Sequence, residues 1–143
     1  MQGVRVFPLK IINTPNGEVK HALKNSDDSF SGFGEAYFSS VDFGTIKGWK
    51  KHTQMILNLI VPVGEIKFTV FDDREGSESF GQYFSIILGN GNYQRLSISP
   101  NLWVAFEGIG KGENTLLNIA SIEHNPDEAV NMDLNNTIFS YQR

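Results

Sequence analysis

Apolar residues recur at every second position through most of the chain, a pattern typical of β-strands. In residues 65–71, Ile66, Phe68 and Val70 alternate with positions 67, 69 and 71, which predicts a half-buried strand. Comparable runs rich in β-branched and aromatic residues lie at 4–9, 17–23, 35–41, 55–63, 82–88, 94–99, 102–106 and 115–121. No window has the 3.6-residue period of an amphipathic helix. The pattern therefore predicts an all-β protein.

Turn sequences separate these runs, among them TPNG (14–17), GNGN (89–92) and GIGKGEN (108–114). Many short strands at such spacing favour a sandwich or barrel, which buries the apolar faces and removes exposed edges. The segment 54–63 is apolar on both faces, so it is expected to be covered on both sides. Residues 24–34 are expected to form a flexible loop. From Asn125 onward the chain is polar, and we expect it to lie across the barrel or to reach a neighbouring subunit.

The composition narrows the class of protein. A chain of 143 residues suits one domain, spanning 1–143. Its 12 basic and 16 acidic residues give a net charge of -4, which argues against nucleic-acid or anionic-membrane partners. The absence of cysteine excludes disulfides, thiolate metal sites and cysteine nucleophiles. No apolar run approaches the roughly 20 residues that span a membrane, and no signal-peptide core is seen, so a cytoplasmic protein is expected.

The segment KGWKKHTQ (47–54) places three lysines and a histidine immediately before the most apolar run of the chain. If it enters a strand, Gly48, Lys50, His52 and Gln54 share one face. A lysine and a histidine on an inward face would be costly in a dry core, because each charge must be desolvated. A polar, ligand-holding cavity explains them; the alternative is a solvated strand end. Asn118, within the run 115–121, projects into the same cavity or satisfies a neighbouring backbone group.

Other chemical signals carry less information. A metal site is not expected, because a mononuclear β-barrel metal centre commonly begins with a His-x-His pair, and Lys50 occupies the place of its first histidine. The turn GIGKGEN is similar to a phosphate loop, but no predicted helix follows it. His21 has a surface or structural role in the expected hairpin region.

The order of motifs resembles a known family. KGWKKHTQ, then Arg74 with GSESFGQY (76–83), then LSISPNLWVAF and IASIEHNPDEAVNMDL resemble the dTDP-4-dehydrorhamnose 3,5-epimerases and their sugar-nucleotide relatives in the cupin superfamily. The resemblance runs from about Pro15 to Leu134. It implies a double-stranded β-helix (jelly-roll) domain and a homodimer. It also implies a nucleotide-linked 4-keto-6-deoxyhexose as substrate, with neither metal nor cofactor.

The resemblance also implies roles. In that family a histidine removes a proton beside the ketone, a lysine stabilises the enolate and a tyrosine returns a proton. Lys47 stands at a diphosphate-binding arginine and Lys50 at the usual base. His52 matches the second histidine of the similar dTDP-4-keto-6-deoxyglucose 3,4-ketoisomerases. His52 is therefore the expected base and Lys50 the enolate stabiliser, or the reverse. His124, near the family's tyrosine position, is the expected acid.

Further side chains are expected to bind substrate. Lys47 and Arg74 are candidates for the diphosphate, and Tyr37, Tyr83 or Trp103 for stacking on the base or sugar, with Asn118 and Gln54 in the cavity. The C-terminal segment whose aspartate orients the family's histidine has no counterpart. Three functions follow: an epimerase of surface-polysaccharide sugar biosynthesis, a 3,4-ketoisomerase, or an inactive cupin that binds a nucleotide sugar or a partner enzyme.

Overall fold

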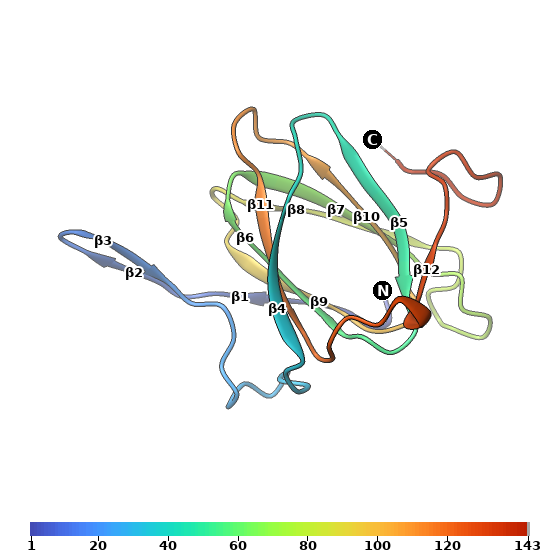
Figure 1. Ribbon diagram of the computed structural model, residues 1–143, viewed down its shortest axis with the longest axis horizontal. Helices are drawn as coiled ribbons and strands as arrows, with labels where there is room; N and C mark the ends of the chain where they lie inside the picture. Colours follow the sequence, from blue (N-terminus) through green and yellow to red (C-terminus); the bar gives the residue numbers. More distant parts are fainter. Residues whose placement is uncertain (143) are drawn as a thin grey trace.

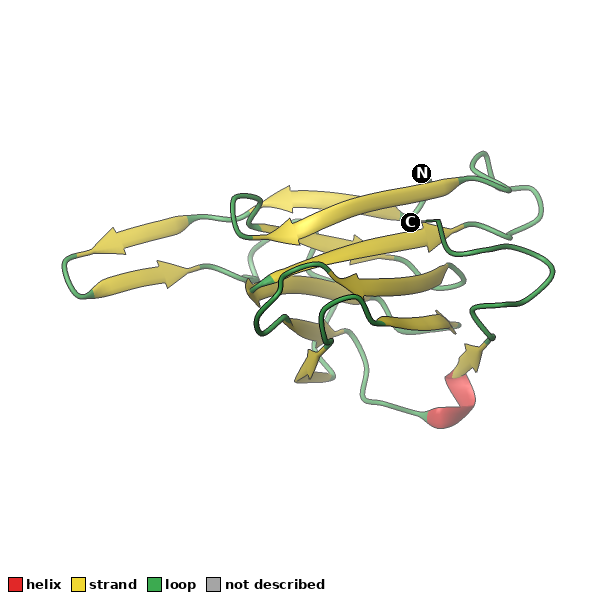
Figure 2. Cartoon of the chain, turned by 90° about the horizontal axis from the view of Figure 1, so that it is seen from above, coloured by secondary structure: helices red, strands yellow, loops and turns green. Residues whose placement is uncertain are grey.

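The computed structural model, which describes residues 1–142, is built from two five-stranded antiparallel sheets packed face to face (Figures 1 and 2). The first sheet has the order β1 (Val4–Pro8), β9 (Gln94–Ile98), β6 (Leu57–Val63), β11 (Thr115–Ala120) and β4 (Glu35–Ser40). The second has the order β12 (Ala129–Asn131), β5 (Ile46–His52), β10 (Trp103–Gly108), β7 (Glu65–Phe71) and β8 (Tyr83–Gly89). The only helix among the described residues is the 3-10 turn η1 (Pro126–Glu128). The predicted all-β jelly roll is confirmed.

A hairpin of β2 (Ile11–Thr14) and β3 (Gly17–Lys20) forms a separate two-stranded sheet. It extends away from the two packed sheets, at the far left of Figure 1, and every one of its residues is exposed. No helix in residues 1–142 has the length and apolar character needed to cross a membrane.

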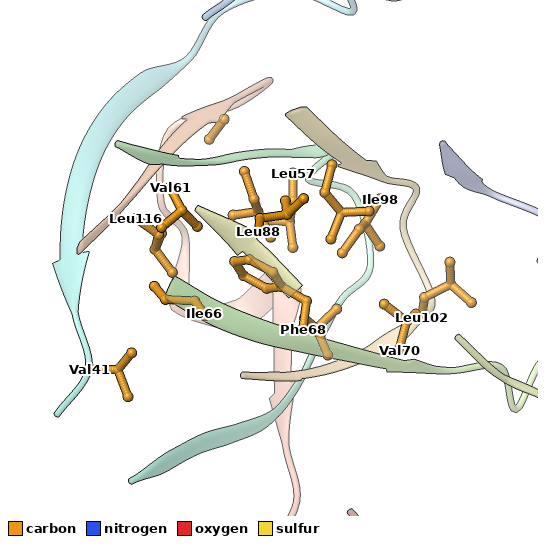
Figure 3. Close-up of a cluster of buried hydrophobic side chains, with 14 of the residues drawn as sticks. Val41, Leu57, Val61, Ile66, Phe68, Val70, Leu88, Ile98, Leu102 and Leu116 are labelled. Carbon is orange, nitrogen blue, oxygen red and sulfur yellow. The ribbon is translucent and has the colours of Figure 1, made fainter. Parts of the chain in front are cut away.

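The core lies between the sheets (Figure 3). β6 contributes Leu57, Leu59 and Val61 to the same core cluster as Phe68 and Val70 of β7. Phe68 and Val70 are fully buried, so alternation along each strand directs its apolar residues to a shared interior. The hydrophobic effect of this burial holds the two sheets together.

β6 is buried on both faces, as its composition predicts. Its outward-facing Asn58 accepts a hydrogen bond from Nη1 of Arg95 at 2.6 Å, and Arg95 is itself only 1% exposed. Nη2 of Arg95 donates to Oγ of Ser29 at 2.5 Å. Ser29 belongs to the loop predicted to be flexible, so this part of the loop packs on the outer face of the first sheet.

The C-terminal segment covers the outer face of the second sheet. β12 pairs with β5, and Phe139 then packs in a cluster with Trp49, Phe71 and Trp103. The ring centroids of Phe139 and Trp49 are 5.1 Å apart in an edge-to-face arrangement. The chain after Asn125 thus lies across its own barrel. Alternation along β7 places Phe71 on the outward face of the strand, and the packing of Phe139 against this face explains why Phe71 is buried.

Candidate active site

A cavity of about 360 Å³ opens between the two sheets on the side of β4 and β5. Its walls combine apolar residues of the core with several polar side chains. The lining residues are Tyr37, Ser39, Lys47, Gly48, Trp49, Lys50, His52, Leu57, Leu59, Val104, Phe106, Leu116, Asn131 and Met132. A pocket of this size, apolar but with a few convergent polar groups, is typical of a small-molecule site.

β5 places the candidate catalytic side chains. Lys50 and His52 line the cavity, whereas Lys51 between them points to the other face and pairs with Asp73 at 2.9 Å. The strand lies close against β10 at Gly48, which has φ +131°; a Cβ there would lie 2.7 Å from Cα of Ala105. Only glycine fits this approach. The predicted shared face of Lys50 and His52 is therefore present, and it faces a cavity.

His52 is held by a carboxylate that no sequence motif indicated. Its side chain is 6% exposed, and its Nδ1 forms a short hydrogen bond with Oε1 of the buried Glu128. Oε2 of Glu128 accepts the backbone N–H groups of Thr53, Gln54 and Met55 at 3.1–3.2 Å. The turn that follows β5 thus wraps around this carboxylate and fixes it beneath the imidazole.

The environment of Glu128 keeps it ionised. Burial alone raises the pKa of this carboxyl, but the hydrogen bonds from His52, Gln54 and Met55 and the charge of His52 together hold the pKa below its ordinary value. An ionised carboxylate can only accept hydrogen bonds, so Nδ1 of His52 must carry the proton. In the neutral imidazole Nε2 is then the acceptor nitrogen, which is the arrangement required of a general base.

Cations dominate the polar wall. Lys47 and Lys50 line the cavity with His52, and no carboxylate is among the lining residues. Nζ of Lys47 donates to the backbone oxygen of Ser40 at 2.5 Å, while Lys50 has no ion pair or hydrogen-bond partner within residues 1–142. Such a wall attracts an anionic ligand and stabilises negative charge that develops inside the cavity.

On the opposite sheet, Tyr37 also lines the cavity. Asn118 lies behind it: Nδ2 of Asn118 donates to the Tyr37 hydroxyl at 3.0 Å, and Oδ1 accepts the backbone N–H of Asn58 at 3.1 Å. Asn118 is not itself among the lining residues: it satisfies the backbone N–H of Asn58 and contacts the hydroxyl of the cavity-lining Tyr37.

Three predicted binding residues lie elsewhere. β5 ends at His52, and Gln54 is exposed in the following turn, outside the cavity. Trp103 is on the outward side of β10, where its Nε1 donates to Asp73 at 2.7 Å. Tyr83 stacks beside Phe71 on that same outer face, with ring centroids 4.7 Å apart. Strand alternation places Val104, not Trp103, in the cavity.

Arg74 and His124 are also outside the cavity. The guanidinium of Arg74 is held by both oxygens of the buried Asp72 at 2.8 Å and by the backbone oxygen of Gln2 at 2.7 Å. Its charge is thus neutralised within the protein. His124 is exposed in the segment between β11 and η1. The structure brings together Lys47, Lys50, His52, Tyr37 and Asn118, and separates the other predicted site residues from them.

Glu128 is the site residue that sequence reasoning missed. It lies in the polar stretch after Asn125, which has no strand or helix periodicity, and Asn125 and Pro126 position it by starting η1. The side chain of Asn125 caps this turn by accepting the N–H of Asp127. Within residues 1–142, no group of three or more His, Cys, Asp or Glu side chains is arranged to hold a metal ion.

The fold and the cavity define a cupin whose cation-rich interior presents a carboxylate-oriented histidine. No protein-family model matches the chain. A solved dTDP-sugar isomerase from Desulfovibrio desulfuricans is 33% identical, with a TM-score of 0.91, and the alignment covers 94% of this chain and 86% of that one. The chain therefore belongs to the family of dTDP-4-dehydrorhamnose 3,5-epimerase-like sugar-nucleotide cupins.

A curated relative is a probable low-salt glycan biosynthesis epimerase of Haloferax volcanii, 26% identical over 80% of this chain and 75% of its own. Less similar structures share the fold. A dTDP-4-dehydrorhamnose 3,5-epimerase of Sulfolobus tokodaii has a TM-score of 0.81 at 19% identity, covering 96% and 84% of the two chains. A 3,4-ketoisomerase of Thermoanaerobacterium thermosaccharolyticum has 0.75 at 20%, covering 91% and 88%.

Proposed function

We propose that this protein is an epimerase that inverts a carbon beside the 4-keto group of a nucleotide-linked 4-keto-6-deoxyhexose. The product would serve surface-polysaccharide biosynthesis; the Haloferax relative is named as a probable low-salt glycan biosynthesis epimerase. The observation that carries the proposal is the His52–Glu128 pair. Glu128 occupies Nδ1 of His52, which leaves Nε2 available to a substrate in the cavity that His52 and Lys50 both line.

His52, Lys50 and Lys47 have distinct roles in this proposal. His52 removes the proton from the carbon next to the ketone, and the ion pair with Glu128 stabilises the imidazolium that results. The ammonium of Lys50 stabilises the enolate oxygen, because a cation acts strongly in a cavity partly closed to water. Lys47, at the mouth, binds the diphosphate. Substrate and product have the same oxidation state, so the two proton transfers need no redox cofactor.

Incubation with dTDP-4-keto-6-deoxyglucose in deuterated water tests this function. The wild type should incorporate deuterium at C3, C5 or both, as followed by NMR, and the product should have an inverted centre. His52→Asn should lower the rate by about 10²–10⁴-fold, the usual contribution of a general base. The exposed His124→Asn is the matched control and should remain active. No deuterium incorporation at either carbon would overturn the epimerase assignment for this substrate.

The 3,4-ketoisomerase is a second candidate, favoured by the place of His52 in the strand, two residues after Lys50. The same experiment separates the two, because an isomerase moves the carbonyl from C4 to C3, which the carbon chemical shifts of the product reveal. An inactive nucleotide-sugar-binding cupin would give neither product. It would still raise its unfolding temperature when a dTDP-sugar binds.

We further propose a cytoplasmic homodimer whose contact includes the β2–β3 hairpin. Ile12 and Val19 are directly paired across the hairpin and are 38% and 52% exposed. β4 is an edge strand carrying Phe38, which is 70% exposed. Exposed apolar groups on a projecting hairpin and on an unpaired edge suit a second copy of the chain. Light scattering should give the dimer mass for the wild type and the monomer mass for Ile12→Lys/Val19→Lys; a monomeric wild type contradicts the proposal.

A further inference from the structure

Tyr37 occupies the side of the cavity opposite His52. It extends from β4 in the first sheet, whereas His52 and Lys50 extend from β5 in the second, and all three line the one cavity. Figure 1 shows β4 and β5 lying apart, in different sheets. A sugar ring bound between the sheets would therefore present one face to His52 and the other to Tyr37.

The hydrogen bonds of Tyr37 fix the direction of its proton. The backbone N–H of Asn58 donates to Oδ1 of Asn118 at 3.1 Å, and this assigns the amide so that Nδ2 faces Tyr37. Nδ2 donates to the Tyr37 hydroxyl oxygen at 3.0 Å, so this oxygen is an acceptor there. Asn58 and Asn118 are both fully buried, so the two hydrogen bonds of Asn118 are held in fixed positions. The hydroxyl proton has no acceptor within residues 1–142 and is left for the cavity.

We propose that Tyr37 is the acid that delivers a proton to the carbon on the face opposite His52; this rests on the proposed epimerase function. His52 Nε2 takes the proton, and the C–H electron pair forms the enolate. The enolate collapses to the ketone as its carbon forms a new C–H bond with the Tyr37 proton, and the O–H electrons stay on the phenolate. Solvent reprotonates Tyr37, and the imidazolium returns its proton to water.

Asn118 is a positioning residue in this step. Its N–H donates to the oxygen on which negative charge develops, so the hydrogen bond strengthens as the proton leaves. Tyr37 is 39% exposed, which gives solvent access for reprotonation.

The other candidate acids do not reach the cavity. His124 is exposed outside it. The remaining three tyrosines of the chain have partners elsewhere: Tyr83 accepts the N–H of Ser140, Tyr93 donates to the backbone oxygen of His21, and Tyr141 donates to Glu107. Tyr37 is the one tyrosine among the cavity-lining residues.

Separate measurement of deuterium exchange and of inversion tests the proposal. With dTDP-4-keto-6-deoxyglucose in deuterated water, Tyr37→Phe should retain exchange within about 3-fold, because His52 still removes and returns the proton on its own face. Inversion should fall by about 10²–10⁴-fold. Asn118→Ala should lower inversion by a smaller factor, also with exchange retained. Tyr93→Phe, the same change at a tyrosine outside the cavity, is the control and should keep both rates.

Three results would overturn the role of Tyr37. Inversion retained within about 3-fold in Tyr37→Phe would show that another group is the acid. Loss of exchange and inversion together, with an unchanged unfolding temperature, would show that Tyr37 serves binding or base positioning. Absence of exchange in the wild type would remove the epimerase function itself, so the two failures are distinguished. Should Tyr37→Phe unfold, Tyr37→His, which restores an acid, should recover part of the inversion and decides the case.

Discussion

At the scale of single residues, the pairing of His52 with Glu128 determines what the site can do. The three backbone N–H groups of residues 53–55 converge on Oε2 of Glu128, while Oε1 faces the imidazole. One carboxylate thus serves as the acceptor for a backbone turn and as the group that selects the tautomer of the base.

Glu128→Gln should therefore inactivate the enzyme without unfolding it. The backbone N–H groups will select the amide oxygen, which turns the amide NH₂ toward Nδ1 of His52 and forces the proton onto Nε2. The base then has the wrong tautomer. We expect kcat to fall by about 10²–10⁴-fold with a small change in KM, measured by steady-state epimerisation.

The exposed Glu123→Gln is the control and should retain wild-type kcat. The variant Glu128→Asp, which keeps the charge but is shorter, should recover part of the activity. Equal loss from the Asp and Gln variants would contradict a role through the tautomer and would indicate a purely structural carboxylate.

At the scale of elements, β5 is held at one edge by β10 and on its outer face by the C-terminal segment. Gly48 lies against β10, where a Cβ would approach Cα and Cβ of Ala105 to 2.7 Å. Gly48→Ala should lower the free energy of unfolding by about 1–3 kcal/mol, because neither backbone can give way without disturbing the sheet. Urea denaturation measures this. Gly112→Ala, where a Cβ meets nothing within 4 Å, should stay within about 0.5 kcal/mol of wild type.

The C-terminal segment packs on the outer face of β5, where Phe139 contacts Trp49. Phe139 is 6% exposed and stacks on Phe71 with ring centroids 4.5 Å apart. Phe139→Ala should cost about 3–5 kcal/mol of unfolding free energy, whereas its neighbour Ile138→Ala, at 73% exposure, should cost almost nothing. Equal effects of the two substitutions in urea denaturation would show that the segment does not stabilise the sheet.

The elements also show how far the sequence predicts this molecule. Alternation over six or seven residues predicts the long strands, and it places Lys50 and His52 on one face because both lie within β5. β12 has only three residues, which are too few to show the alternation of apolar and polar positions that identifies a strand. Its pairing with β5 holds it in place. Gln54 was misplaced because the alternation stops where the strand ends. The contact of Glu128 with His52 spans 76 positions, and no local pattern encodes it.

At the scale of the whole molecule, one buried ion pair ties the N-terminus to the loop between β7 and β8. Asp72 is fully buried and accepts hydrogen bonds from Arg74, Ser77 and Ser79 at 2.6–2.8 Å. Arg74 reaches on to the backbone oxygen of Gln2. The arginine that resembles a diphosphate ligand in the sequence therefore acts on stability.

The acid stability of the protein should depend on Asp72. The hydrogen bond from Arg74 lowers the pKa of Asp72 well below its ordinary 3.8, against the opposing effect of burial, and Ser77 and Ser79 lower it further. Because the folded pKa is depressed, the stabilisation is complete above the unfolded value and is lost as the pH falls toward the folded one. Asp72→Asn should cost about 3–5 kcal/mol at neutral pH, and the cost should shrink below about pH 4. Urea denaturation across this pH range measures the loss of unfolding free energy, and the exposed Asp28→Asn is the control. A loss that does not depend on pH would show that Asp72 contributes through packing and not through its charge.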